Sequence, residues 1–239
     1  MILLAMNFRL TLMPGLLVLL LLQPGLSFYV PGVAPEDFQA GGPIDVKAVK
    51  MTSAHTQLPY EYYSLELCKP KSGIVEYFSQ NLGQIIRGER IVNTPYAVEM
   101  TNNAECKVLC QDKKWDAKAS AEAGYRIEHE YFVHLIMDNL PCATRFSMPD
   151  TGEVQYEPGY RLGYHSNGKN YINNHLKFLL KYHLDEDTNT YRVVGFLVET
   201  QSVDKSGLEI KGRRSFYNKI KCKMTIKAQS SLLSVPHNY

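Results

Sequence analysis

Residues 160–203 read YRLGYHSNGKNYINNHLKFLLKYHLDEDTNTYRVVGFLVETQSV, and this stretch decides the fold. Over 175–183, apolar residues at even positions alternate with mostly polar residues at odd positions, which is typical of a strand with one buried face. Asn167-Gly168 is a strong signal for a two-residue hairpin turn, and the acidic loop Asp185–Asn189 precedes the next apolar run. We therefore expect three successive antiparallel strands, over 160–164, 175–183 and 191–203.

Other segments fit the same reading. In the last of these strands, Val194, Phe196 and Val198 are predicted to share the buried face. Residues 44–51 alternate in a similar way, and residues 131–137 are rich in the aromatic and branched side chains that strands favour. The sequence therefore predicts a mainly β fold, built as an antiparallel β-sandwich or a meander.

One segment, Asp116–Glu130, is predicted to be helical. It carries four alanines among lysines and glutamates, and Asp116 is a good N-cap residue. Gly124 weakens the helix by about 1 kcal/mol relative to alanine. We expect one short helix within the β fold.

The N-terminus has the pattern of a secretory signal peptide over residues 1–27. Arg9 precedes the apolar run Leu10–Leu22, and small residues at 25 and 27 predict cleavage between Ser27 and Phe28. The apolar run is shorter than the roughly 18 residues that cross a bilayer, so we expect a cleaved signal rather than an anchor. The mature chain is then expected in the lumen of the secretory pathway or outside the cell.

Charge is nearly balanced along the chain. The 26 basic and 24 acidic residues argue against nucleic acid or an acidic substrate as a partner. Basic residues are concentrated only between Asp204 and Lys227, a segment with eight Lys or Arg and two acidic residues. We expect 204–239 to be a basic, disordered tail.

Five cysteines follow the predicted signal: Cys68, Cys106, Cys110, Cys142 and Cys222. Disulfides are expected in an oxidising lumen, and the odd number leaves one cysteine over. Strand residues four apart lie about 13 Å from each other, so Cys106 and Cys110 each need a distant partner. The connectivity stays open at this point. A zinc site is the alternative, although no second cysteine pair or histidine follows at finger spacing.

No catalytic constellation is evident in the sequence. His129 and His134 are five residues apart, whereas a metalloprotease helix needs a spacing of four. Asp138 could present a functional carboxylate, but a strand-ending turn explains it equally well. The tyrosines at 60, 62 and 63 either pack near a strand or form a contact surface. We predict no enzymatic activity, no cofactor and no metal.

Several blocks after the signal occur together and in order. They are FYVPGVAP (28–35), LPYEYYSL (58–65), NLG (81–83), RGERIVNTPY (87–96), CxxxC (106–110), the stretch 131–141, GYRLG (159–163) and YRVV (191–194). This arrangement resembles the nonaspanins, the transmembrane nine superfamily, and is most similar to the branch linked to phagocytosis and adhesion.

The resemblance implies that 28–203 form a non-enzymatic luminal β-rich domain of an endosomal or Golgi membrane protein. Such proteins are thought to help localise other membrane proteins. The implied partners are luminal parts of membrane-protein cargo and the protein's own membrane bundle, with no nucleic acid and no small-molecule substrate. The tyrosine cluster Tyr60, Tyr62 and Tyr63 is the candidate contact surface.

The resemblance also implies which cysteines form disulfides and which one is free. Cys68, Cys106 and Cys110 match family cysteines, and Cys222 stands in for another, which makes these four the candidate disulfide cysteines. Cys142 is the candidate free thiol.

From Asp204 the resemblance is expected to end, before the nine spanning helices of the family. A truncated isoform, a misread gene model or a fragment would each explain this. Two alternatives stay open: a secreted carbohydrate-binding module or enzyme on a β-sandwich, suggested by 16 tyrosines in 239 residues, and a truncated product without a function.

Overall fold

The computed structural model describes residues 36–78, 82–113, 115–203 and 220–230. The chain divides into Met1–Ala34 and Pro35–Tyr239, and the fold below is that of the second unit. The predicted signal peptide and its cleavage site lie outside the described residues. Among the described helices, none combines the length and the apolar run needed to cross a bilayer.

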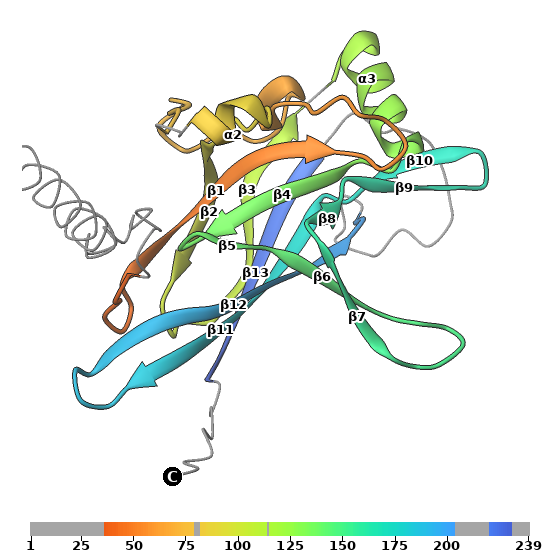
Figure 1. Cartoon of the computed structure of the whole chain (residues 1–239). Helices are drawn as coiled ribbons and strands as arrows, with labels where there is room; N and C mark the ends of the chain where they lie inside the picture. The colour runs from red at the N-terminus through yellow and green to blue at the C-terminus, as the bar shows by residue number, and fades with distance from the viewer. Residues whose placement is uncertain (1–35, 79–81, 114, 204–219, 231–239) are drawn as a thin grey trace, which may run out of the picture. The chain divides into compact units, whose positions relative to one another are not determined.

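Strands dominate the described part of the chain, which confirms the prediction of a mainly β fold (Figure 1). The first sheet has five strands: β2 (Val92–Glu99), β1 (Pro43–Thr52), β4 (Phe132–Met137) and β5 (Leu140–Pro141) in this order, with β8 (Tyr160–Arg161) also paired to β4. The second has six, in the order β3 (Ala104–Lys113), β13 (Ile220–Ser230), β11 (His175–Asp185), β12 (Thr190–Gln201), β6 (Ala143–Ser147) and β7 (Val154–Pro158).

The remaining elements are a small sheet and three short helical segments. β9 (Gly163–Ser166) and β10 (Lys169–Ile172) form a two-stranded sheet, and the helices are η1 (Tyr62–Ser64), α2 (Leu82–Ile86) and α3 (Ala117–Glu128). Asn167 and Gly168 both have positive φ, at 51° and 69°, as a two-residue hairpin turn with this sequence requires. The expected row of three antiparallel strands is therefore wrong in its first member, because β9 pairs with β10 instead of β11.

The β11–β12 hairpin is confirmed, with an unbroken antiparallel ladder from His175↔Gln201 to Lys181↔Gly195. The register then shifts, and Tyr182 pairs with Val193. This bulge leaves Val194 exposed and buries Val193, so the predicted grouping of Val194 with Phe196 is wrong. One extra residue in a strand reverses the facing of every residue before it, and simple alternation cannot show where that happens.

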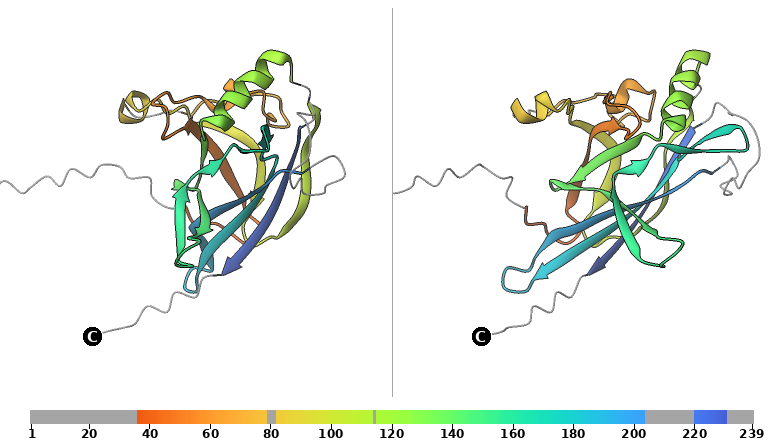
Figure 2. Two further views of the ribbon diagram at one scale, coloured as in Figure 1. Left: turned by 90° about the vertical axis from the view of Figure 1, so that its right-hand side faces the viewer. Right: turned by 45° about the vertical axis from the view of Figure 1, so that its right-hand side comes forward.

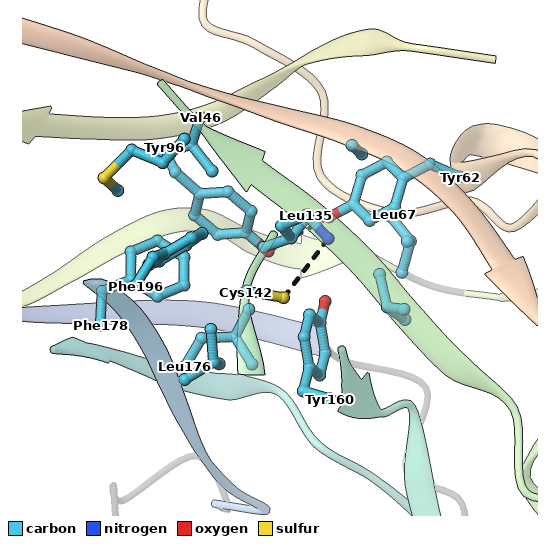
Figure 3. Close-up of a cluster of buried hydrophobic side chains, with 14 of the residues drawn as sticks. Val46, Tyr62, Leu67, Tyr96, Leu135, Cys142, Tyr160, Leu176, Phe178 and Phe196 are labelled. Atoms are coloured by element: carbon cyan, nitrogen blue, oxygen red, sulfur yellow. Dashed lines mark hydrogen bonds between the residues drawn. The ribbon is translucent and has the colours of Figure 1, made fainter. Parts of the chain in front are cut away.

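The hydrophobic core lies between the two large sheets (Figure 3). The ring of Phe178 in β11 lies 5.0 Å from that of Tyr96 in β2 and 5.3 Å from that of Phe196 in β12, in edge-to-face geometry in both pairs. β4 supplies its alternate residues Val133, Leu135 and Met137, all with no exposed surface. Apolar alternation on facing strands therefore closes one shared core.

Helix α3 is confirmed at its predicted place. Oδ1 of Asp116 accepts a hydrogen bond from the backbone N–H of Ala119 at 2.7 Å, which is an N-cap contact. Gly124 is buried, and a Cβ atom there would lie 3.2 Å from Nδ2 of Asn170 in β10. The glycine that weakens the isolated helix therefore lets α3 pack closely on the small sheet.

The expectation of a disordered tail is corrected for Ile220–Ser230. These residues form β13, which pairs parallel to β11 and antiparallel to β3. In the sequence, apolar Ile220, Cys222, Met224, Ile226 and Ala228 alternate with polar residues. This is a strand signal that the high lysine content obscured. Residues 204–219 and 231–239 lie outside the described residues.

Candidate interaction surface

The tyrosine cluster predicted as a contact surface is packed against the fold. Tyr62 is only 3% exposed, and its hydroxyl oxygen lies 3.1 Å from that of Tyr96. The Tyr63 hydroxyl donates to the backbone oxygen of Asn93 at 2.8 Å. Tyr62 therefore cannot present a surface, because its ring fills the core, and Tyr63 is half-buried.

The third tyrosine covers a buried charge. The Arg126 guanidinium carbon lies 4.1 Å from the ring centre of Tyr60, a cation–π contact. Burial lowers the pKa of Arg126, and among the described residues its Nη1 has no hydrogen-bond acceptor. The aromatic face offsets part of the cost of burying this charge, so Tyr60 has a structural role.

The turn at Asp138 and Asn139 joins β4 to β5, and both residues have positive φ. Asp138 Oδ1 accepts from the backbone N–H of Glu36 at 3.2 Å, and burial raises the pKa of the Asp138 carboxyl. The turn borders a cavity of about 190 Å³ that is also lined by Glu36, Asp45 and Lys47. The strand-ending turn is thus what the structure shows, and it borders a recess lined by residues of both charges.

The two histidines lie on different elements. His129 ends α3, and its ring stacks on Tyr125 with centroids 4.0 Å apart. His134 is within β4, with Nε2 2.6 Å from Oγ1 of Thr52, and burial lowers its pKa. In the described part of the chain, no group of three or more His, Cys, Asp or Glu side chains could hold a metal ion.

Cysteine positions differ from the pattern that the resemblance implied. Cys68 is bonded to Cys110, with Cα atoms 5.9 Å apart. Cys106 is instead a free, exposed thiol, since its place four residues along β3 separates it from that disulfide. Cys142 is free and buried: Leu135 N–H donates to its sulfur at 3.4 Å, and burial raises the pKa of the thiol to about 11 (Figure 3). The side chain of Cys222 lies outside the description.

The most exposed part of the second sheet is the β6–β7 hairpin. Phe146, Val154 and Tyr156 are 38%, 49% and 55% exposed, and they lie on both faces of the ribbon. Among the described residues, β6 pairs in register with β12 at one position, Ala143↔Leu197, and β7 pairs with β6. Figure 1 and the right-hand view of Figure 2 show its loop end extending away from β11 and β12. The hairpin therefore presents apolar side chains together with a strand edge that no other described strand pairs with.

A second set of exposed apolar side chains belongs to α2 and to the segments before it. Its members are Leu58, Ile74, Tyr77, Ile85 and Ile86, of which the last two lie in α2. Neither group was predicted from the sequence. Alternation identifies strands with one buried face, and 143–158 has few buried positions on either face.

These features define a β-sheet domain whose distinguishing surface is an exposed hairpin. The sequence model of the endomembrane protein 70 family matches residues 59–239, which are 181 of the 239 residues, and the chain therefore belongs to this family. The match runs past Asp204, where the resemblance was expected to end. No solved structure matches this chain.

The relatives confirm the resemblance to the transmembrane nine superfamily. The chain is 45% identical over 219 residues to transmembrane 9 superfamily member 4 of Rattus norvegicus, covering 84% of this chain and 34% of the relative. The protein of the same name from Homo sapiens is 47% identical over 194 residues, with 74% and 30% covered. Putative phagocytic receptor 1a of Dictyostelium discoideum is 37% identical over 185 residues, with 71% and 27% covered. The chain thus spans about a third of the length of these relatives.

Proposed function

We propose that this chain is a non-enzymatic luminal domain that contacts other membrane proteins of the endosome and Golgi and contributes to their localisation. The observation that carries the proposal is membership of a family whose relatives are named as transmembrane proteins and, in one case, as a putative phagocytic receptor. In a longer family member, the protein's own membrane bundle is a second partner of the domain.

The β6–β7 hairpin is the contact surface of this proposal. A two-stranded ribbon with water on both faces has little stability of its own, and exposed apolar side chains favour a partner. The outer edge of β7 offers backbone N–H and C=O groups in a row, which can add a strand from another protein. The expected partner is an extended luminal segment of a membrane protein with an apolar residue at every second position.

Proximity labelling in cells tests this contact. A variant with Val154→Ser and Tyr156→Ser should lose most labelled membrane proteins, because both apolar contacts of one ribbon face are removed. Val194→Ser is the matched control, since Val194 is equally exposed but lies in the β12 bulge. Equal labelling by the hairpin variant and wild type would reject the hairpin, and labelling of no secretory membrane protein would reject the proposed function.

The luminal location has its own test. The tagged chain should be processed to a form that begins at Phe28, as read by mass spectrometry of its N-terminus. A chain that keeps Leu10–Leu22 and resists carbonate extraction from membranes would show an anchor instead, and the proposed processing would be wrong.

A further inference from the structure

Three cysteines converge where β3 pairs with β13. Cys110 of β3 is bonded to Cys68, and the Cα atom of Cys110 is also the register partner of the Cα atom of Cys222. The backbone therefore places a third cysteine directly across the strand pair from one half of a disulfide. This juxtaposition has no role in the contact surface described above.

Cys110 has two cysteine neighbours, one through its disulfide and one through strand register. Opposite residues of regular antiparallel strands have Cα atoms about 4.5–5.5 Å apart, within the range of about 4.4–6.8 Å that disulfides span. The β3–β13 ladder shifts register on both sides of the Cys110↔Cys222 pair, so it is the pairing of the Cα atoms, and not a regular spacing, that places Cys222 opposite Cys110. Since Cys110 bonds one sulfur at a time, the two disulfides exclude each other.

We propose that Cys68, Cys110 and Cys222 form a thiol–disulfide exchange site, in which Cys110 alternates between two partners. The Cys222 thiolate attacks the sulfur of Cys110, the Cys110–Cys222 bond forms, and the bond to Cys68 breaks. Cys68 leaves as a thiolate and takes up a proton in place of the one that Cys222 lost. One disulfide is present before and after, so the step needs no oxidant or reductant.

The burial of Cys68 favours exchange within the chain. Cys68 is 3% exposed, which keeps dissolved thiols away from its sulfur. A cysteine of the same chain whose Cα atom pairs with that of Cys110 does not have to diffuse in from solvent.

The exchange moves a covalent link from one part of the fold to another. The Cys68 bond ties the segment after η1, whose Leu65 and Leu67 are buried, to β3. The Cys222 bond ties β13 to β3 within one sheet. The segment after η1 then keeps its packing and the hydrogen bond from Trp115 Nε1 to the backbone oxygen of Glu66 but loses its covalent tie, so the redox state of these three cysteines sets how firmly it is attached.

Peptide mapping of the whole chain, alkylated without reduction, tests the site. Trypsin cleaves after Lys107, which separates Cys106 from Cys110, and after the lysines on both sides of Cys222. Each disulfide therefore gives a linked peptide of distinct mass. Wild type should give both the Cys68–Cys110 and the Cys110–Cys222 peptides.

Single variants sharpen the test. Cys68→Ala should give Cys110–Cys222 as its main disulfide, with a loss of most Cys222 alkylation relative to the reduced protein. Cys222→Ala should give Cys68–Cys110 alone. Cys106→Ala is the matched control and should leave the wild-type peptides unchanged, because Cys106 lies about 13 Å along β3 from Cys110.

Cys110 and Cys222 both alkylated in Cys68→Ala would overturn the proposal, and so would a Cys68–Cys222 peptide in place of Cys110–Cys222. If Cys68→Ala fails to fold, the wild-type protein decides the question in a glutathione redox buffer. Appearance of the Cys110–Cys222 peptide there supports the exchange, and persistence of Cys68–Cys110 alone rejects it.

Discussion

Two hairpins of the same six-stranded sheet differ in what surrounds them. β11–β12 is joined by a long ladder with one bulge and buries one face against the other large sheet, whereas β6–β7 has exposed residues on both faces. Both are antiparallel and hydrogen-bonded in the same way. The difference shows that alternation of apolar and polar residues indicates a strand with one buried face. A strand that is hydrogen-bonded but exposed on both faces has no such alternation in its sequence.

The largest expected contrast is between two phenylalanines, one in each hairpin. Phe178→Ala should lower the free energy of unfolding by about 3–5 kcal/mol, because the ring is fully buried between Tyr96 and Phe196. Phe146→Ala should stay within about 0.5 kcal/mol of wild type, as is usual for exposed positions. Urea denaturation followed by circular dichroism measures both. Equal losses would mean that the β6–β7 hairpin also packs against the core.

A smaller contrast lies within β12, at neighbouring residues. Val193→Ser should lower the free energy of unfolding by about 1–3 kcal/mol, since a hydroxyl replaces buried methyl groups. Val194→Ser should change it by no more than about 0.5 kcal/mol. The same denaturation experiment tests the bulge, and a larger loss at Val194 would place the register shift elsewhere.

The smallest expected effect concerns a buried titratable side chain, His134, and the dependence of the unfolding free energy on pH. Burial lowers the pKa of His134, so the folded state disfavours its protonation. Its contribution to stability is complete above the unfolded pKa of about 6.5 and is lost as pH falls through that value toward the lower folded pKa.

Replacing His134 by Gln should flatten the dependence of unfolding free energy on pH between about 7 and 5, since pH 6.5 is the ordinary midpoint. The measurement is the difference between the wild-type and variant slopes. An identical slope in His134→Gln would contradict the burial argument.

Much of the fold could be predicted from the sequence where one face of an element is buried. β11, β12 and α3 were each predicted within a few residues of their ends, because alternation or a cap marks them. β6 and β7 gave no such signal. β13 alternates clearly, but its lysines led to the prediction of a solvated tail.

The candidate surface was less predictable than the fold. Tyr62 and Tyr63 were considered because aromatic residues suit both cores and interfaces, and the sequence does not separate these roles. The exposed fraction of a side chain depends on which other elements pack over it, and that packing is set by the tertiary structure. The disulfide between Cys68 and Cys110 likewise depends on a contact between residues 42 apart in sequence.

The position of β13 has a consequence for the order in which the chain can fold during synthesis. β3 and β11 become adjacent to a common strand only when Ile220–Ser230 is inserted between them. At about 5–20 residues per second, the ribosome supplies that strand several seconds after β3 has emerged. Until then β3 and the outer edge of β11 are open strand edges, and this interval is when a chaperone would protect the nascent domain from aggregation.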